Sequence, residues 1–255
     1  MTTRDQYVAF IQRTFDDATQ ETVNSGHPIQ FGDDFVGGGH TAGIPGAGSP
    51  AAGYPWVKKI VGAAPPTVAL DSNSIGGTIS CTLAATSEAE DAGLYWNDSL
   101  SFDMTKFGMV EWRAKLAVLP TGVAGAALGV GSAWVSGGFL SFARYLGFGW
   151  AASGALLVYA LDGVQTAVSV AAKQIGGSAI TTDTTNSHLY RIDWSNNSDI
   201  VFYVDGNRVN AVGSVTWTAT AGANSVMQPW AEVYKAAGTG VGTLTIDKID
   251  MLNSR

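Results

Sequence analysis

Few residues of this sequence stand at a spacing that would support acid–base chemistry. Glu88 and Glu90, two of the chain's five glutamates, share one parity, so a strand would point both carboxyl groups to one face. They belong to the polar run from Ser87 to Asp91 before Gly93, which is more typical of a solvated loop. We therefore expect no catalysis by this pair.

Other groups that could react are scattered along the chain. Glu111 alternates outward beside Arg113 and Lys115, which favours a surface ion pair over an acid–base role. The histidines lack metal-ligand spacing, and the sequence contains no Gly-x-Ser-x-Gly nucleophile motif. Cys81 lies in an alternating segment and is expected to be a small buried residue. The glycine run 37–39 precedes no Lys, so we do not expect a phosphate loop.

Aspartates could supply oxygen ligands to Ca²⁺, but they form no dense cluster, and turn formation explains them better. His188 opens a predicted strand and is expected to be structural. We therefore expect no metal and no other cofactor. The aspartates considered are Asp33, Asp34, Asp162, Asp199 and Asp205.

The chain is rich in tryptophan. Trp112 and Trp194 fall at inward parities of predicted strands and are expected in the core. Six others lie near predicted strand ends or loops, where an exposed indole could stack on a sugar ring or anchor an interface. Partly buried packing is the competing interpretation for each of them. The six are Trp56, Trp96, Trp134, Trp150, Trp217 and Trp230.

Composition excludes several classes of protein. The 255 residues carry a net charge of −7, with 14% charged, 46% hydrophobic and 10% aromatic residues. Disorder throughout does not fit this aromatic content, one cysteine cannot form a disulfide scaffold, and the negative charge disfavours nucleic-acid binding. No apolar stretch approaches the roughly 20 residues of a membrane span, and the N-terminal residues are polar. We expect a protein kept or assembled in a cytoplasm.

One segment predicts a helix, which would form an N-terminal arm over residues 1–26. Residues 3–6 have the spacing of a capping box, and apolar residues then recur at helical spacing from about Gln6 to about Thr22. The arm could cover the following domain or dock on another subunit. Its candidate partner-binding residues are Tyr7, Phe10, Ile11 and Phe15.

The rest of the chain predicts strands after a connector. Residues 27–55 are rich in Gly, Pro and Ala and predict an extended connector. Short strand patterns follow over residues 56–255, with a bulge expected near residues 247–248, while residues 121–138 fit either a strand or a loop. The turns between them favour an antiparallel sandwich or barrel. The predicted strands are 57–61, 67–70, 78–84, 110–116, 156–161, 189–194, 200–204 and 243–251.

Several of these pieces resemble the concanavalin A-like lectin/glucanase jelly-roll superfamily, which includes laminin-G-like domains. Residues 107–116 look like its Gly-x-x-Glu-x-Arg-x-Lys strand, and residues 188–206 read His-x-Tyr-x-Ile-x-Trp followed by Phe-Tyr-Val-Asp-Gly. Residues 31–35 resemble a piece near the start of its domain, and residues 244–251 resemble its closing strand. The resemblance covers about residues 30–252 and implies an all-β, two-sheet antiparallel sandwich.

The resemblance also implies what a catalytic member would contain. Laminarinase-like glycosidases of this fold carry Glu-x-Asp-x-x-Glu on one strand, which points two carboxyl groups into a cleft. None of the five glutamates here begins such a motif. We therefore predict that the protein is not an enzyme.

The leading hypothesis is a phage virion structural protein, namely a capsid decoration or cement protein. The resemblance implies such a use, since phages employ this fold in capsid-associated and tail proteins. Its partners would be the major capsid protein or other virion proteins, and it would form a homo-oligomer, for which a trimer is the guess. It would lie on the capsid surface. A carbohydrate-binding module of a tail or fibre is the alternative, and a glycosidase comes third.

Overall fold

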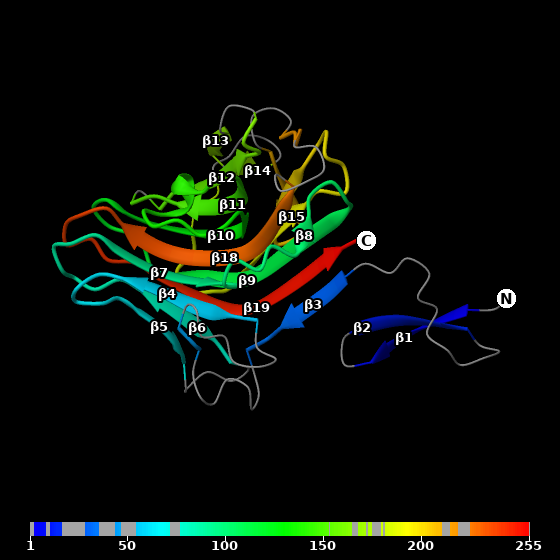
Figure 1. The fold of residues 1–255 in the computed structure, drawn as a ribbon, viewed down its shortest axis with the longest axis horizontal. Coiled ribbons are helices and arrows are strands. Elements are labelled where there is room, and N and C mark those ends of the chain that lie inside the picture. The colour runs from blue at the N-terminus through cyan, green and yellow to red at the C-terminus, as the bar shows by residue number, and fades with distance from the viewer. Residues whose placement is uncertain are drawn as a thin grey trace.

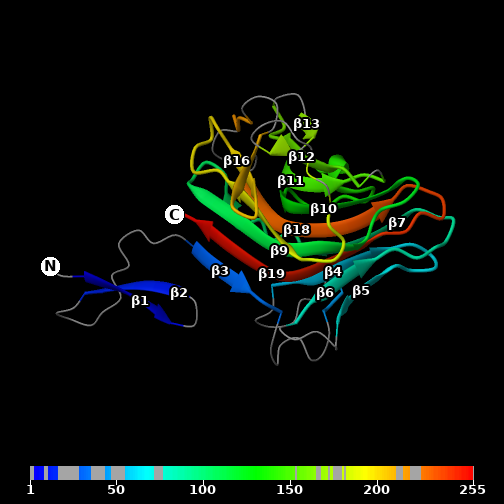
Figure 2. The same cartoon turned by 180° about the vertical axis from the view of Figure 1, so that it is seen from behind.

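The computed structural model describes residues 3–8, 11–16, 29–35, 44–46, 55–71, 77–152, 154–164, 168–171, 173–174, 180, 182–210, 215–218 and 225–254. Within them the fold is all-β, apart from one short 3-10 helix, η1 (Phe139–Ser141). Two curved sheets lie against each other (Figure 1, Figure 2). The long strands β9 (Gly108–Val118) and β19 (Thr243–Asn253) pair in one sheet, and β18 (Val226–Lys235) lies in the other.

Both sheets are antiparallel throughout their described strand pairings. The eight-stranded sheet has the order β13 (Val168–Ala171), β12 (Leu156–Leu161), β11 (Tyr145–Trp150), β10 (Ala124–Gly131), β18 (Val226–Lys235), β7 (Glu90–Tyr95) and β4 (Val57–Val61), with β8 (Phe102–Asp103) on β18. The nine-stranded sheet has the order β14 (Lys173–Gln174), β17 (Asn207–Asn210), β16 (Val201–Val204), β15 (His188–Asp193), β9 (Gly108–Val118), β19 (Thr243–Asn253), β6 (Ile79–Thr82) and β5 (Thr67–Leu70), with β3 (Ile29–Asp33) on β19.

The main core lies between the two sheets and follows the alternation of the strands. On β9, the side chains at positions 110, 112, 114 and 116 are completely buried, as the pattern predicts. Trp112 and Trp194 are in this core, and so is Cys81, whose burial raises the pKa of its thiol to about 12. The predicted bulge is confirmed by a register shift on β19 between Ile246 and Lys248.

The predicted N-terminal helix is wrong. Residues 3–16 form two antiparallel strands instead, β1 (Thr3–Val8) and β2 (Ile11–Asp16), which pair from Thr3 opposite Asp16 to Val8 opposite Ile11. Both segments contain β-branched and aromatic residues, which favour strands. In a hairpin the two strands satisfy each other's backbone hydrogen bonds, so no long apolar face is needed. Of the predicted arm residues, Phe10 lies outside the described residues, and Tyr7, Ile11 and Phe15 are placed by their backbone only.

The sandwich starts earlier than the expected boundary at residue 56. Strand β3 falls within the predicted connector, yet it pairs with the C-terminal half of β19 from Ile29 opposite Asn253 to Asp33 opposite Ile249. Asp33 then accepts a hydrogen bond from the indole Nε1 of Trp56 at 2.9 Å. These contacts attach residues 29–33 to the nine-stranded sheet.

Two segments differ from their predicted structure. Residues 90–95, expected in part as a loop, form β7, whose six residues are all buried. The ambiguous segment 121–138 contains both alternatives, since β10 occupies residues 124–131 and is followed by a loop. Strands buried on both faces show no alternation, so their sequence gives no period-two signal. Residues 200–204 are apolar at both parities, yet Val201 and Tyr203 on one face of this strand are only half-buried.

A buried ion pair joins the neighbouring strands β18 and β7. The Nζ of Lys235 on β18 lies 3.3 Å from a carboxylate oxygen of Glu90 on β7, and neither side chain is exposed. The same Nζ donates to the backbone oxygens of Ala84 and Thr86, both at 2.6 Å, and Glu90 accepts from the backbone N–H of Ala84. Glu90 is therefore not the solvated loop residue that its sequence context predicts.

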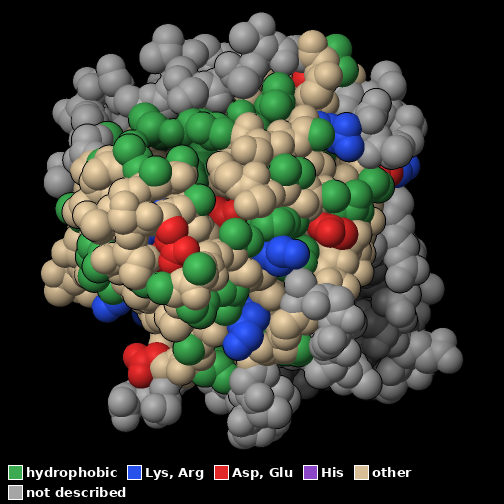
Figure 3. Space-filling view, turned by 60° about the vertical axis from the view of Figure 1, so that its left-hand side comes forward, with side chains coloured by type: hydrophobic (Ala, Val, Ile, Leu, Met, Phe, Trp, Pro, Cys, Tyr) green, Lys and Arg blue, Asp and Glu red, His purple; other side chains and the backbone are tan. Residues whose placement is uncertain are grey.

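None of the described helices is long and apolar enough to cross a bilayer. Charged residues make up 14% of the chain, and on the face shown in Figure 3 the charged side chains stand apart from one another among hydrophobic and other atoms. Arg113 pairs with Asp247 at 2.9 Å rather than with Glu111. This exposed pair offers a comparison for the buried one.

We expect Lys235→Met to lower the free energy of unfolding by about 3–5 kcal/mol, because the variant removes the ion-pair partner of a fully buried Glu90. Urea denaturation measures the loss. Arg113→Met is the control and should change stability by no more than about 1 kcal/mol. Adding Glu90→Gln to Lys235→Met should recover part of the loss. Equal effects of the two single variants would contradict this account.

Candidate functional site

The outer face of the eight-stranded sheet, turned away from the other sheet, carries a second aromatic cluster. Alternate residues of its strands project there, and they form a core separate from the one between the sheets. We call this group the outer-face cluster. Its members are Val57, Tyr95, Ala127, Phe139, Phe142, Tyr145, Tyr159 and Trp230, with Trp134, Leu157, Leu161 and Tyr234 packed against them.

The loop between β10 and β11 covers this cluster, and we call residues 132–144 the covering segment. Phe139 lies flat on Trp230, with ring centroids 5.4 Å apart and an interplanar angle of 12°. Phe142 meets the same indole edge-on at 5.3 Å and 76°. Both phenylalanines are at most 2% exposed. Trp230 therefore has its ring covered by the chain's own side chains.

Polar contacts fix the covering segment to the sheet below. Asp91 accepts hydrogen bonds from the hydroxyl of Ser136 at 2.9 Å and the backbone N–H of Gly137 at 3.0 Å. Asp98 accepts one from the backbone N–H of Trp134 at 2.7 Å. The amide of Gln228 donates both to Asp98 and to the backbone oxygen of residue 132, at 2.8 and 3.1 Å.

Glycines provide the space in which the aromatic rings lie. A Cβ at Gly131 would stand 2.5 Å from the Nε1 of Trp230 and 2.7 Å from Phe142. A Cβ at Gly149 would stand 2.7 Å from Tyr159 and 3.2 Å from Phe139. These distances are shorter than carbon atoms tolerate, so the covering layer requires glycine beneath it.

Two acidic side chains share the outer face. Glu232 on β18 pairs with Gly93, and Tyr234 pairs with Asp91, so the two carboxyl groups are diagonal neighbours on adjacent strands. Burial raises the pKa of Glu232 well above its ordinary value, and the charge of Asp91 raises it further. The Phe139 backbone N–H and the Trp134 indole lower it slightly, although neither makes a hydrogen bond of ordinary geometry with Glu232.

Asp91 differs from Glu232 in being hydrogen-bonded. Burial raises the pKa of Asp91, while the bonds from Gly137 and Ser136 oppose that shift. This pair could not be predicted from the sequence, because its members come from strands separated by more than half of the chain. Only knowledge that β7 pairs with β18 would have shown that Glu232 and Asp91 lie together.

The structure buries five of the six candidate tryptophans. Trp56, Trp96, Trp150, Trp217 and Trp230 are each at most 8% exposed and cannot stack on a sugar unless covering groups move. Trp134 is half-buried on the covering segment. Its ring lies 6.3 Å from that of Tyr95, and the Nζ of Lys59 lies 4.9 Å from its centroid.

The remaining candidates have local structural roles. Glu88 accepts hydrogen bonds from the backbone N–H groups of Ala63 and Ala64, both at 2.7 Å, and these bonds lower its pKa. Asp162 accepts from the backbone N–H of Val164 two residues later, which is the predicted turn role. In the parts of the chain that the structure describes, no three His, Cys, Asp or Glu side chains converge as a metal site.

Comparisons with known proteins support the fold. The sequence matches no family model and no curated protein. Its structure is similar to a protein of unknown function from Shewanella oneidensis MR-1, with a TM-score of 0.57 and 12% identity over 93% of this chain and 91% of that one. It is also similar to the laminarinase from Rhodothermus marinus, with a TM-score of 0.54 and 14% identity over 89% and 99% of the two chains.

A third similar structure is SCLam, a non-specific endo-beta-1,3(4)-glucanase from family GH16. Its TM-score is 0.55, with 13% identity over 91% of this chain and 93% of that one. These likenesses identify the architecture as a concanavalin A-like jelly-roll sandwich, as the sequence motifs predict. At such low identity they carry the fold and not the activity.

We expect the stability of the protein to fall as pH rises, because of Glu232. Because the pKa of Glu232 is raised in the folded state, its carboxyl group keeps a proton at pH values where the unfolded glutamate, with a pKa near 4.5, has already lost it. The contribution of Glu232 to the free energy of unfolding is therefore complete below the unfolded pKa. Above it, this contribution declines by about 1.4 kcal/mol per pH unit until the folded group ionises. Glu232→Gln should remove this decline, leaving the smaller slope that Asp91 causes.

Urea denaturation at several pH values from 4 to 8 tests the prediction. Glu111→Gln, a change of the same chemistry on the nine-stranded sheet, is the control and should keep the wild-type slope. A Glu232→Gln variant with the wild-type slope would show that the carboxyl group does not retain its proton.

Proposed function

We propose that this protein is a non-enzymatic structural protein of a phage virion, a decoration protein that binds across neighbouring capsid subunits and stabilises the head. The observation that supports a non-enzymatic role is the packing of Phe139 and Phe142 on Trp230. It covers the sheet face on which Glu232 and Asp91 lie. Covered carboxyl groups cannot meet a polysaccharide chain.

Adhesion is the mechanism of this proposal. A surface of low charge loses little hydration when it is covered, and several apolar side chains stand exposed, among them Val123, Leu140 and Val164. An interface of about 800 Å² per partner suffices for a stable complex, and repeated copies on a capsid add avidity. The major capsid protein or another virion protein would be the partner. A closed homo-oligomer on the capsid surface, assembled in the host cytoplasm, completes the proposal.

Deletion of residues 1–28 tests whether the N-terminal segment makes the attachment. The cut falls before β3, so every strand of the sandwich is kept. We expect the truncated protein to melt as the full chain does, but to lose co-sedimentation with empty capsids and no longer raise their melting temperature. Unchanged capsid binding would exclude the segment from the mechanism.

Carbohydrate binding is the second candidate, and the position of Trp134 favours it. This indole is only half-buried, stands beside Tyr95 and carries the Lys59 ammonium over its ring, so it offers an aromatic surface with nearby donors. A module on a tail or fibre could use such a surface to hold a glycan.

Trp134→Ala should abolish any signal on a glycan array if that second role is real, because the variant removes the stacking surface. Leu140→Ala, an exposed apolar residue on the same covering segment, is the control and should leave the signal unchanged. Wild-type protein without any glycan signal would eliminate the candidate. Reducing-sugar release from β-glucan that Glu232→Gln abolishes would overturn the non-enzymatic proposal.

A further inference from the structure

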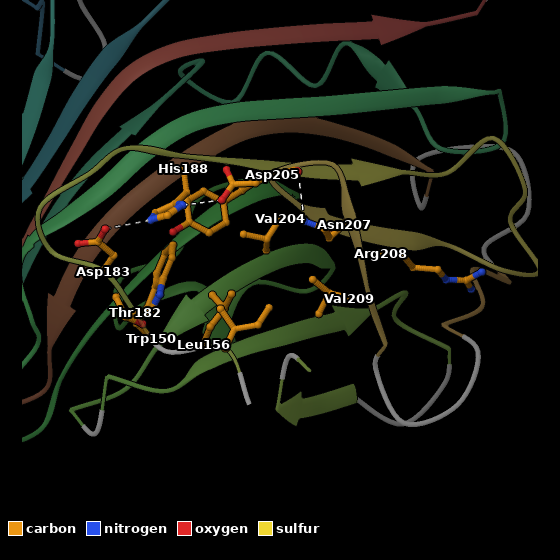
Figure 4. A pocket seen from close by; sticks show the side chains of 12 residues that line it. Trp150, Leu156, Thr182, Asp183, His188, Val204, Asp205, Asn207, Arg208 and Val209 are labelled. Atoms are coloured by element: carbon orange, nitrogen blue, oxygen red, sulfur yellow. Dashed lines mark hydrogen bonds and ion pairs between the residues drawn. The ribbon is translucent and has the colours of Figure 1, made fainter. Parts of the chain in front are cut away.

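A cavity of about 320 Å³ lies at the open end of the sandwich, away from the outer-face cluster. It is bounded by β11 and β12 of one sheet and by β15, β16 and β17 of the other (Figure 4). Its apolar wall consists of Trp150, Leu156, Ile180, Val204 and Val209. This volume and lining are typical of pockets for small organic molecules.

The other wall of the cavity is acidic. Asp183 and Asp205 stand on either side of His188, as Figure 4 shows. The Nδ1 of His188 lies 2.6 Å from a carboxylate oxygen of Asp205, and its Nε2 lies 3.6 Å from one of Asp183. Because a carboxylate only accepts, Nδ1 carries the proton that Asp205 binds. The Nε2 atom, by contrast, is buried and makes no hydrogen bond.

Among the described residues, no lysine or arginine pairs with Asp183 or Asp205. Arg208 also lines the cavity, but its guanidinium bonds to both carboxylate oxygens of Asp199 at 3.1 Å. Hydrogen bonds from Thr185 and Asn186 hold the pKa of Asp183 at about 2, so this group is charged at any physiological pH. Among the described residues, the ion pairs of Asp183 and Asp205 involve His188 alone.

The field of these carboxylates reaches the cavity wall. Burial raises the pKa of the Tyr190 hydroxyl, and the charges of Asp205 and Asp183 raise it further. The indole Nε1 of Trp150, a residue only 2% exposed, has no hydrogen-bond partner either. The cavity thus combines an apolar wall, a negative wall and two unpartnered polar atoms.

We propose that this cavity binds a small organic cation, namely a protonated amine attached to an apolar or aromatic body. The ammonium group lies beside Asp183 and donates to its carboxylate, and the body packs on Leu156, Val204 and the Trp150 ring. A bare metal ion fits less well, because Asp183 and Asp205 face opposite nitrogens of the His188 ring, and no group of three His, Cys, Asp or Glu among the described residues could hold a metal ion. This site is independent of capsid attachment.

Three probes of similar shape test the proposal on the full chain. Phenethylamine is the cation, 2-phenylethanol is its neutral counterpart and 3-phenylpropionate is the anion. We expect phenethylamine to bind about tenfold or more tightly than the alcohol, and the anion not to bind. Calorimetry gives the affinities, and the indole N–H resonance of Trp150 in NMR spectra reports occupancy of the cavity.

Variants locate the binding and its charge dependence. Asp183→Asn should bring the affinity for phenethylamine down to that for the alcohol, while leaving the alcohol's affinity unchanged. Asp193→Asn, the same change at the far end of β15, is the control and should bind both as the wild type does. Equal affinity of the wild type for amine and alcohol, absence of amine binding, or full amine affinity in Asp183→Asn would each overturn the proposal.

Discussion

The eight-stranded sheet has two apolar faces, and the chain has to cover both. One face meets the other sheet, as in any sandwich. The other would expose Trp230 and a set of tyrosines to water, at a cost of roughly 25 cal/mol for each Å² of apolar surface. The covering segment with Phe139 and Phe142 removes that surface from solvent. The glycines beneath the covering segment leave room for this packing, and the hydrogen bonds that Asp91 and Asp98 accept from the segment stabilise it.

The covered face and the cavity place acidic side chains in different surroundings. Two carboxyl groups lie together on the covered face beneath aromatic side chains, where burial raises the pKa of Glu232. In the cavity, by contrast, Asp183 and Asp205 lie beside an apolar wall, and hydrogen bonds hold the pKa of Asp183 at about 2. The extent of burial therefore decides what an acidic side chain can do on the covered face and in the cavity.

The sequence predicted those parts of the fold in which one strand face is polar. Alternation located β9, and a change of parity between Ile246 and Ile249 located the bulge of β19. The jelly-roll motifs supplied the class of fold. Strands β7 and β18 escaped prediction because both of their faces are buried, so the spacing of apolar residues carries no period. The N-terminal hairpin was missed because its aromatic residues also satisfy a helical repeat.

Neither site could be predicted, since each depends on which strands become neighbours. Glu232 meets Asp91 through the pairing of β18 with β7, and His188 meets Asp205 through the turn that joins β16 to β17. Apolar periodicity states which residues are buried but not which of them touch. The identities of the individual residues were informative only after the order of the strands was known.

Strand β19 has a consequence for how the molecule assembles. It pairs along its length with β9 on one side and with β6 and β3 on the other, and all three come earlier in the chain. During synthesis these earlier strands therefore have unsatisfied edges until β19 has emerged. Contacts between such distant segments make folding slow, and open edges invite pairing with other chains. The nascent chain is thus most vulnerable to aggregation before β19 takes its place in the sheet.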